Sequence, residues 1–244
     1  MRNIVISQPM FFPWVGIFEQ IRLAEIYVHY DDVQFSKGSF VNRVQIKTSQ
    51  GIKWLTVPLE KLKLGIKIDE AMIDNKQDWK RRHLVFLEQA YRTAPFKEDM
   101  LHIISSVYEK PHRTIAELSM DSIEAVCRYY GLDREMTIIR SSTLNVSGES
   151  SERVLDIVKK CDGSKYITGH GAQHYLNHSL FEANDIDVRY MVYQKRPYQQ
   201  LHGEFTPYVS VLDLIANTGV EGIGNINSGT ISWKEFMNGS DRTI

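Results

Sequence analysis

Residues 4–35, IVISQPMFFPWVGIFEQIRLAEIYVHYDDVQF, decide the fold of this chain. Residues 4–6 form a short apolar β-branched run, which is typical of a buried parallel strand. From residue 17 onward the apolar side chains recur at helical spacing, and a second short run at residues 26–30 ends in polar side chains. The stretch therefore predicts a strand, a loop, a helix and a second strand.

Polar side chains follow both predicted strands. In open α/β sheets, ligands bind in the crevice outside the carboxyl ends of the strands. We therefore expect the residues after the two strands to lie side by side at the mouth of a crevice and to bind substrate. They are Gln8 and Pro9 after the first strand, and Asp31, Asp32 and Gln34 after the second.

The rest of the chain continues to alternate between strands and helices. We expect a β-hairpin from residues 41–47 and 53–57, helices at 79–93, 97–109, 114–130, 150–160 and 207–217, and strands at 136–140, 166–168 and 186–193. Residues 67–73 are compatible with another short strand. The pattern predicts a Rossmann-like α/β fold with a mostly parallel sheet, an inserted hairpin and a helical middle segment. We expect a single domain over residues 1–244, in which residues 79–130 are at most a subdomain.

Composition excludes several classes of function. The 244 residues include 29 basic and 30 acidic side chains, which gives a net charge of −1 and no bulk attraction to nucleic acid or to an anionic membrane. No apolar run approaches the ~20 residues of a membrane span, and no signal peptide is evident, so we expect a cytoplasmic soluble protein. Cys127 and Cys161 form neither a metal-binding spacing nor a disulfide framework.

The loop PMFFPWVGIF between the first strand and the first helix is a candidate ligand-binding loop. Two prolines and Gly16 stiffen the start of a helix whose free N–H groups suit an anion. Trp14 and Phe12 suit the covering of a ring such as a nucleobase. The alternative is that these aromatic side chains only plug the top of the sheet.

This loop also resembles the HxGH loop of the nucleotidylyltransferases in its position. Pantothenate synthetase has a similar strand, a loop with histidines, a helix, and a second strand ending near a glutamine. Trp14 and Phe18 stand where the two histidines would fall around Gly16. The resemblance implies a shared architecture without the usual phosphate-stabilising chemistry.

Two further polar groups follow along the chain. Asp31 and Asp32 suit Mg²⁺ binding, general-base catalysis or hydrogen bonds to sugar hydroxyls, and the alternative is a solvated strand end with a turn-forming aspartate. Asn42 and Arg43, on the hairpin, offer an amide and a planar fork suited to a carboxylate or diphosphate. The alternative for Arg43 is an exposed surface arginine.

The segment TGHGAQHYLNH places His170 between Gly169 and Gly171 at a strand–helix junction. An imidazole there is a candidate general base, with the two glycines giving a substrate close access to the backbone. His170, His174 and His178 are spaced by four residues, so a single helix would align them as metal ligands. We predict no metal site, because no helical glutamate or distant cysteine pair accompanies them.

The segment YQKRPYQQLHGEFTPYVSVLDLIANTG is rich in aromatic, amide and titratable groups, as in a substrate lid. Tyr198 and Gln200 are its candidate substrate contacts. Asp213 lies in an apolar stretch of the following helix, and a buried acid needs a partner. Arg43 and His170 are the candidates for that partner, and the choice stays open.

The chain resembles the WbqC-like family in five segments that occur in order over nearly its whole length. They are QPMFFPWVGIFEQI, YDDVQFSKGSFVNRVQIK, WLTVPL, YITGHGAQHYL and YQQLHGEFTPYVSVLDLIANTG. This bacterial family is associated with gene clusters for surface polysaccharide (O-antigen). The resemblance implies modification of nucleotide-linked amino sugars, with transfer of an amino-acid-type acyl group such as glycine to the sugar amine.

We therefore expect a dTDP- or UDP-linked amino sugar as substrate, with an activated acyl donor of unspecified kind. Asp32, His170, Asn42 and Arg43 are the expected catalytic residues, with Asp32 or His170 as the base. An ATP-dependent ligase, which would need ATP and Mg²⁺, is one alternative. A non-catalytic nucleotide-sugar binding or scaffold protein is another.

Overall fold

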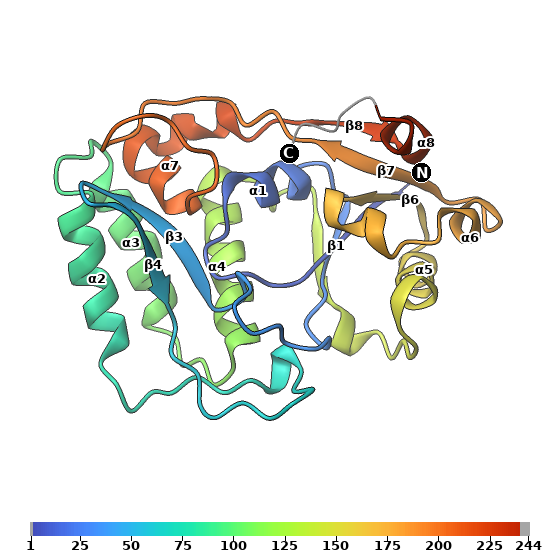
Figure 1. Ribbon diagram of the computed structural model, residues 1–244, viewed down its shortest axis with the longest axis horizontal. Helices are drawn as coiled ribbons and strands as arrows, with labels where there is room; N and C mark the ends of the chain where they lie inside the picture. Colours follow the sequence, from blue (N-terminus) through green and yellow to red (C-terminus); the bar gives the residue numbers. More distant parts are fainter. Residues whose placement is uncertain (1, 240–244) are drawn as a thin grey trace.

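The structure is a computed structural model that describes residues 2–239, and its main sheet has six strands (Figure 1). The strands are β1 (Arg2–Ser7), β2 (Ile26–His29), β5 (Thr137–Arg140), β6 (Gly163–Thr168), β7 (Asp187–Val192) and β8 (Gly229–Ser232). Their spatial order is β5-β2-β1-β6-β7-β8, and all are parallel except β8, which runs antiparallel to β7. Counted along the chain this is the order 3-2-1-4-5-6 of Rossmann-like sheets, so the predicted fold class is confirmed.

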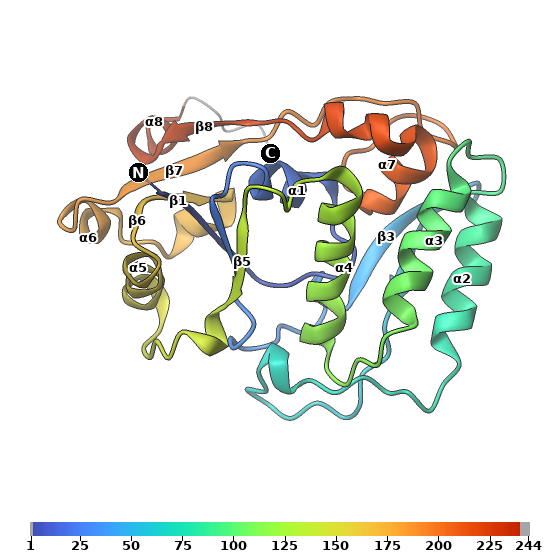
Figure 2. The same cartoon turned by 180° about the vertical axis from the view of Figure 1, so that it is seen from behind.

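Helices cover both faces of the sheet, and each face has its own core. Helices α1 (Val15–Ile21) and α4 (Ile115–Tyr130) pack on one face, where Val5 and Tyr27 point. Helices α5 (Ser150–Lys160) and α6 (His178–Glu182) belong to the core of the other face, with Ile4 and Ile6. Figure 2 shows α4 and α5 on opposite sides of β5. The strands β1 and β2 are buried on both faces, which explains their continuous apolar sequence.

The inserted hairpin and the helical middle segment lie to one side of the sheet (Figure 1). The hairpin consists of β3 (Arg43–Thr48) and β4 (Gly51–Thr56), and the helices are α2 (Trp79–Ala90), α3 (Lys97–Tyr108) and α4. Helix α7 (Val211–Thr218) joins them, since the Phe96 N–H before α3 donates to the Ala216 carbonyl at 3.0 Å. The core of these helices is continuous with the core on the α1 face of the sheet.

Local sequence signals account for the ends of α4, the longest helix among residues 2–239. Thr114 accepts a hydrogen bond from the Glu117 N–H while the Glu117 carboxylate accepts from the Thr114 N–H, which is a capping box. At the other end Gly131 has φ = 66°, the left-handed conformation that glycine adopts without strain. Both ends agree with the prediction from sequence.

Several elements differ from the prediction. The ambiguous residues 67–73 contain the 3₁₀ helix η1 (Ile68–Glu70) rather than a strand. Strand β8 and helix α8 (Trp233–Met237) were not predicted, because each is too short to show a period. Further 3₁₀ helices are η2 (Ser141–Thr143), η3 (His170–His174) and η4 (Gly219–Asn225). None of the helices within residues 2–239 is long and apolar enough to cross a membrane.

Candidate functional site

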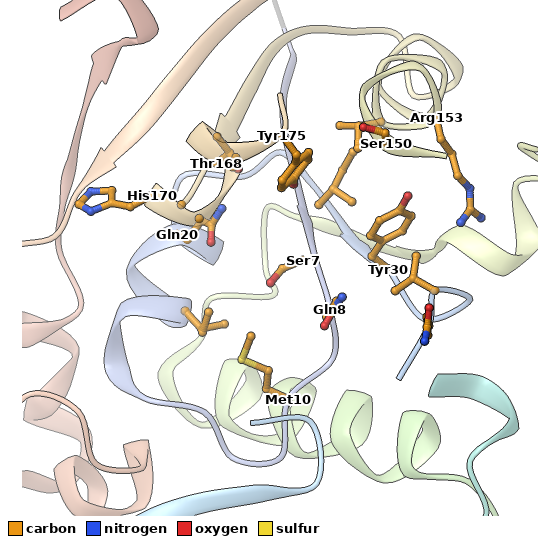
Figure 3. Close-up of a pocket in the computed structure, with 18 of the residues that line it drawn as sticks. Ser7, Gln8, Met10, Gln20, Tyr30, Ser150, Arg153, Thr168, His170 and Tyr175 are labelled. Carbon is orange, nitrogen blue, oxygen red and sulfur yellow. The ribbon is translucent and has the colours of Figure 1, made fainter. Parts of the chain in front are cut away.

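A cavity of about 1080 Å³ opens at the carboxyl ends of the central strands. Ser7 ends β1, Gln8 follows it, Tyr30 follows β2 and Thr168 ends β6 (Figure 3). Asp32 also follows β2 and lines the cavity. β1 and β6 are neighbours in the sheet, and the chain leaves β1 toward α1 on one face and β6 toward α6 on the other. This divergence leaves a crevice, and it is the switch point at which Rossmann-like sheets bind ligands.

The loop after β1 supplies the floor and one aromatic wall of the cavity. Gln8 and Trp14 line it, whereas Pro9 is buried beside it. The Trp14 indole lies against Gly16, where an added Cβ would come 2.1 Å from a ring carbon. Phe12 and Phe18 are fully buried in the core. Of the aromatic residues expected to cover a ring, Trp14 is therefore at the cavity while Phe12 plugs the sheet, as in the alternative interpretation.

The two aspartates after β2 have different surroundings. Asp31 is buried and its carboxylate accepts hydrogen bonds from the Ser141 hydroxyl (3.0 Å), the Ser142 hydroxyl (2.7 Å) and the Ser142 N–H (3.1 Å), so it holds the turn after β5. Asp32 lines the cavity, where Oδ1 lies 2.5 Å from the Ser141 hydroxyl, whose single proton it shares with Asp31, and Oδ2 accepts from Arg153. Both carboxylates therefore bond to groups of the protein, and the main partner of Asp32 is the Arg153 guanidinium. Gln34 also lines the cavity.

Arg153, on α5, is a cavity residue that the sequence analysis did not select. Arg153 is only 7% exposed. Its guanidinium forms an ion pair with Asp32 and lies 5.0 Å from the centroid of the Tyr30 ring. Its Nε donates a hydrogen bond to the Val146 carbonyl (3.2 Å). The signal in the sequence is its place beside Val154 on the apolar stripe of an amphipathic helix, where an unpaired arginine would be costly.

The start of α5 lies beside Arg153 at the same end of the cavity. Gly148, Glu149 and Ser150 line it, and no side chain caps the first N–H groups of the helix. Glu149 is at the N-cap position and Ser150 is the first helical residue, with φ = 54°. Free helix N–H groups and a guanidinium together favour an anion. Burial raises the pKa of the neighbouring Tyr30, which keeps its hydroxyl protonated as a donor.

The opposite end of the cavity is aromatic and carries a lysine. Trp14 contacts Tyr193 at 5.0 Å and Tyr208 at 6.1 Å between ring centroids, and Lys195 lines the cavity beside them. The Lys195 ammonium donates to the Tyr208 hydroxyl at 3.0 Å. Lys195 and Tyr208 were not selected from sequence, since the interval between them shows no period or motif.

His170 lines the cavity together with Gly169 and Gly171, at the junction predicted from sequence. Its Nε2 lies 2.7 Å from the Met191 carbonyl, which can only accept, so Nε2 carries the proton and the lone pair is on Nδ1. The ring lies between Tyr193 and Phe236 and points away from Gln8 and Tyr30 (Figure 3). Any proton transfer to the neutral ring must therefore use Nδ1.

The three histidines spaced by four residues do not share a helix. His170 and His174 belong to η3, whereas His178 begins α6, is buried, and lies 2.8 Å from the Tyr190 hydroxyl. The alternative of an aligned metal-binding row is therefore wrong. Within residues 2–239, no group of three or more His, Cys, Asp or Glu side chains is arranged to hold a metal ion.

Asn42 and Arg43, two of the expected catalytic residues, are not among the described residues that line the cavity. The Asn42 amide donates to the Val57 carbonyl (2.9 Å) and closes the base of the hairpin. The Arg43 guanidinium stacks on Trp54 at 4.2 Å and donates to the Gly38 carbonyl. The sequence places Asn42 and Arg43 soon after the cavity residues Asp32 and Gln34. The hairpin strands, however, form a separate two-stranded sheet, and these two side chains do not reach the cavity.

Tyr198, Gln200 and Asp213 also lie away from the cavity, in a buried hydrogen-bond network. Asp213 accepts from the Tyr198 hydroxyl (2.9 Å) and the Tyr91 hydroxyl (3.0 Å), so its partner is neither Arg43 nor His170. Gln200 donates to Tyr198 (3.0 Å) and accepts from the ammonium of Lys47 (3.0 Å). Burial raises the pKa of the Asp213 carboxyl, and the hydroxyl donors and Lys47 counteract this. The network fastens the predicted lid to the hairpin and to α2.

The structure defines a Rossmann-like α/β protein with a cavity at the switch point of its sheet. Within that class the chain belongs to the WbqC-like protein family, whose family model matches residues 8–224. The uncharacterized protein Rv1507c of Mycobacterium tuberculosis is 32% identical to it over 224 residues, which cover 91% of this chain and 96% of that protein. A comparison with the solved structures finds no significant match.

Proposed function

We propose that the protein is an acyltransferase of the glycyl type. It binds a dTDP- or UDP-linked amino sugar in the cavity and transfers an amino-acid-type acyl group to the sugar amine, as a step of surface-polysaccharide (O-antigen) biosynthesis. The substrate and the reaction in this proposal are those that the resemblance to the WbqC-like family implies. The observation that carries the proposal is the cavity itself, whose two ends differ in chemistry.

One end of the cavity suits the diphosphate of a nucleotide sugar. Arg153 and the uncapped N–H groups of α5 offer several donors to phosphate oxygens, and the ion pair with Asp32 holds the guanidinium in place. Tyr30 and Tyr175 lie close by and suit stacking against a base (Figure 3). This replaces the expected diphosphate site at Arg43 and the first loop.

The volume of the cavity fits a ligand of this size. Small-molecule sites span roughly 300–1,000 Å³, and this cavity, at about 1080 Å³, is at the upper limit. A ligand made of a base, two sugars and a diphosphate would fill one end and extend over Ser7, Gln8, Gln20 and Thr168 toward the other. Hydroxyl and amide groups of this kind are suited to sugar hydroxyls.

The reaction joins the sugar nitrogen to the acyl carbon and breaks the bond from that carbon to its leaving group. The sugar ammonium must lose one proton before it attacks, and the nitrogen loses a second as the amide forms. We assign the first proton to His170 Nδ1 and the second to the leaving group, which departs with the bonding electrons. The donor is an activated acyl group, either on a carrier or tRNA, or as an adenylate formed from ATP and Mg²⁺.

A mass-based assay tests the proposal. Purified protein is incubated with a panel of dTDP- and UDP-amino sugars and with glycine plus ATP, glycyl-tRNA or acyl-coenzyme A, and the sugar is expected to gain the mass of the acyl group. Arg153→Lys keeps the charge but loses the planar fork, and is expected to raise the KM for the nucleotide sugar about tenfold. His170→Ala is expected to lower kcat while KM stays close to the wild-type value.

A non-catalytic nucleotide-sugar binding protein is the second candidate. It is favoured by the occupied carboxylate oxygens of Asp32 and by the direction of the His170 ring, which points away from the cavity centre. Binding of a nucleotide sugar without mass gain under every donor would select this candidate. Failure of all the nucleotide sugars to bind would contradict both.

A further inference from the structure

Lys195 is a strained residue in the wall of the cavity. Its backbone has φ = 46°, a left-handed conformation that residues other than glycine, asparagine and aspartate rarely adopt. Such residues persist only where the surrounding structure holds them, and they gather at ligand sites.

Glu19, on α1, holds the backbone at this position. The residue is 1% exposed, and its carboxylate accepts a hydrogen bond from the Gln194 N–H at 3.2 Å. Burial raises the pKa of Glu19, and the hydrogen bond from the Gln194 N–H counteracts that shift. A buried acid in the first helix thus fixes a segment more than 170 residues later in the chain.

The Lys195 ammonium is left with a neutral partner. It donates to the Tyr208 hydroxyl at 3.0 Å and lies 5.2 Å from the centroid of the Tyr208 ring, and within residues 2–239 it takes part in no ion pair with a carboxylate. Arg153, at the other end of the cavity, is neutralised by Asp32. Lys195 therefore differs from Arg153 in forming no ion pair with a carboxylate among the described residues.

The surroundings of this charge are aromatic. Trp14, Tyr193 and Tyr208 form a continuous wall next to Lys195, and His170 contacts Tyr193 at 5.3 Å between ring centroids. Tyr208 is 46% exposed, so the ammonium can be reached by a ligand that enters the cavity. The candidate base thus lies beside a second anion-binding position.

We propose that Lys195, with Trp14, Tyr193 and Tyr208, forms the subsite for the second substrate, the acyl donor, and binds its anionic oxygens. This inference rests on the proposed function for the role of the ligand, but the subsite is defined by this cluster alone. The anion is the carboxylate of a free amino acid or a phosphate of an activated carrier. Glu19 is the positioning residue that sets the direction of Lys195.

Ligand-observed NMR titrations on the full-length protein test this assignment. The probes are UDP and dTDP for the first subsite, and glycine and acetyl-coenzyme A for the carboxylate and phosphate versions of the second. For Lys195→Met, we expect the affinity for one of the two donor probes to fall about tenfold or more, because a charge-assisted bond is lost. The affinity for UDP and dTDP should stay within about twofold. Lys195→Arg should retain most of the donor affinity.

Lys234→Met is the matched control. The Lys234 ammonium also lies over an aromatic ring, at 5.4 Å from the centroid of Trp233, but it is outside the cavity and forms an ion pair with Glu182 (2.8 Å). This variant should bind all four probes like the wild type. Lack of binding of both donor probes to the wild type would overturn the proposal. So would an equal loss of UDP and donor affinity in Lys195→Met. Lys195-dependent donor binding without any UDP or dTDP binding would support the subsite and contradict the nucleotide-sugar function.

Glu19 has its own pair of variants. Glu19→Ala should weaken binding of the donor probe while UDP binding is kept, and Glu19→Gln, whose amide oxygen can still accept the Gln194 N–H, should restore it. A residue with only a structural role would lower the melting temperature and weaken both kinds of probe together. That result would remove Glu19 from the proposal.

Discussion

The Trp14 side chain packs against the backbone of Gly16, so closely that only a glycine fits at this position. The Trp14 indole covers Gly16 so closely that an alanine Cβ would lie 2.1 to 2.4 Å from three ring carbons. Real Cβ atoms do not come so near, so the ring or the start of α1 would have to move. The contact explains why the loop ends in the sequence Trp-Val-Gly.

Gly16→Ala is therefore expected to destabilise the protein by about 1–3 kcal/mol, the usual cost of forcing extra volume into a packed site. The free energy of unfolding in urea measures the effect, and tryptophan fluorescence reports the displaced indole. Gly224→Ala is the control, because an added Cβ there meets nothing within 4 Å. Equal stability of both variants would show that Trp14 moves without cost.

His83 joins three elements around α2. Its Nε2 donates to the Thr56 carbonyl at the end of β4 (3.1 Å), so the neutral ring accepts from the Tyr108 hydroxyl of α3 through Nδ1 (2.8 Å). Burial lowers the pKa of His83 to about 4, from its ordinary value of 6.5. The unfolded chain therefore takes up a proton at a pH where the folded protein does not.

The sign of the pH effect follows from that difference. Above pH 6.5 neither state binds the proton, and between pH 6.5 and about 4 only the unfolded state does, so stability falls as the pH is lowered through this window. The loss from His83 is at most about 3 kcal/mol. Urea unfolding from pH 7.5 to 4 should show a steeper decline for the wild type than for His83→Gln. Parallel curves would contradict the assignment.

The segment between β7 and α7 is fastened by Lys47 of the hairpin. Lys47 is 4% exposed, and its ammonium donates to Gln200 Oε1 (3.0 Å) and to the carbonyls of Gly203 (3.0 Å) and Glu204 (2.5 Å). Its charge also stabilises the buried Asp213 carboxylate. The element expected to be a mobile lid is therefore tied down along its length.

Lys47→Met should destabilise the protein by about 2–4 kcal/mol, because buried acceptors lose their donor and Asp213 loses its counter-charge. Limited proteolysis should then cut the segment at residues 198–209 first. Lys53→Met, on the exposed side of the same hairpin, should change stability by less than about 0.5 kcal/mol. The same loss in both variants would show that the network does not stabilise the segment.

At the scale of the whole molecule, one apolar core joins the sheet to the helical middle segment. Val5 of β1, Phe18 of α1, Leu87 of α2, Ile104 of α3 and Ile123 of α4 all belong to it. We therefore expect residues 79–130 to unfold together with the sheet. Near-ultraviolet circular dichroism and tryptophan fluorescence should report one coincident transition in urea. Two separated transitions would make the helical segment a subdomain.

Much of the fold followed from local patterns. The apolar run at residues 4–6, the change of period at residue 17 and the alternation that follows predicted the mostly parallel sheet. Cavity-lining positions at strand ends were also predictable, since Gln8, Asp32 and Gln34 line the cavity with Gly169, His170 and Gly171. Strand periodicity and the switch-point rule are sufficient for such positions.

The sequence by itself determined the sheet, the helices and one side of the cavity, because these depend on periods and on the ends of strands. Only the tertiary structure decided which polar and charged groups pair with one another. It pairs Asp32 with Arg153 across 121 positions of the chain, Glu19 with the backbone before Lys195, and Asp213 with two tyrosines. It also turns Arg43 and Asn42 away from the site. Pairing of buried polar groups depends on distances in space, which no spacing along one chain records.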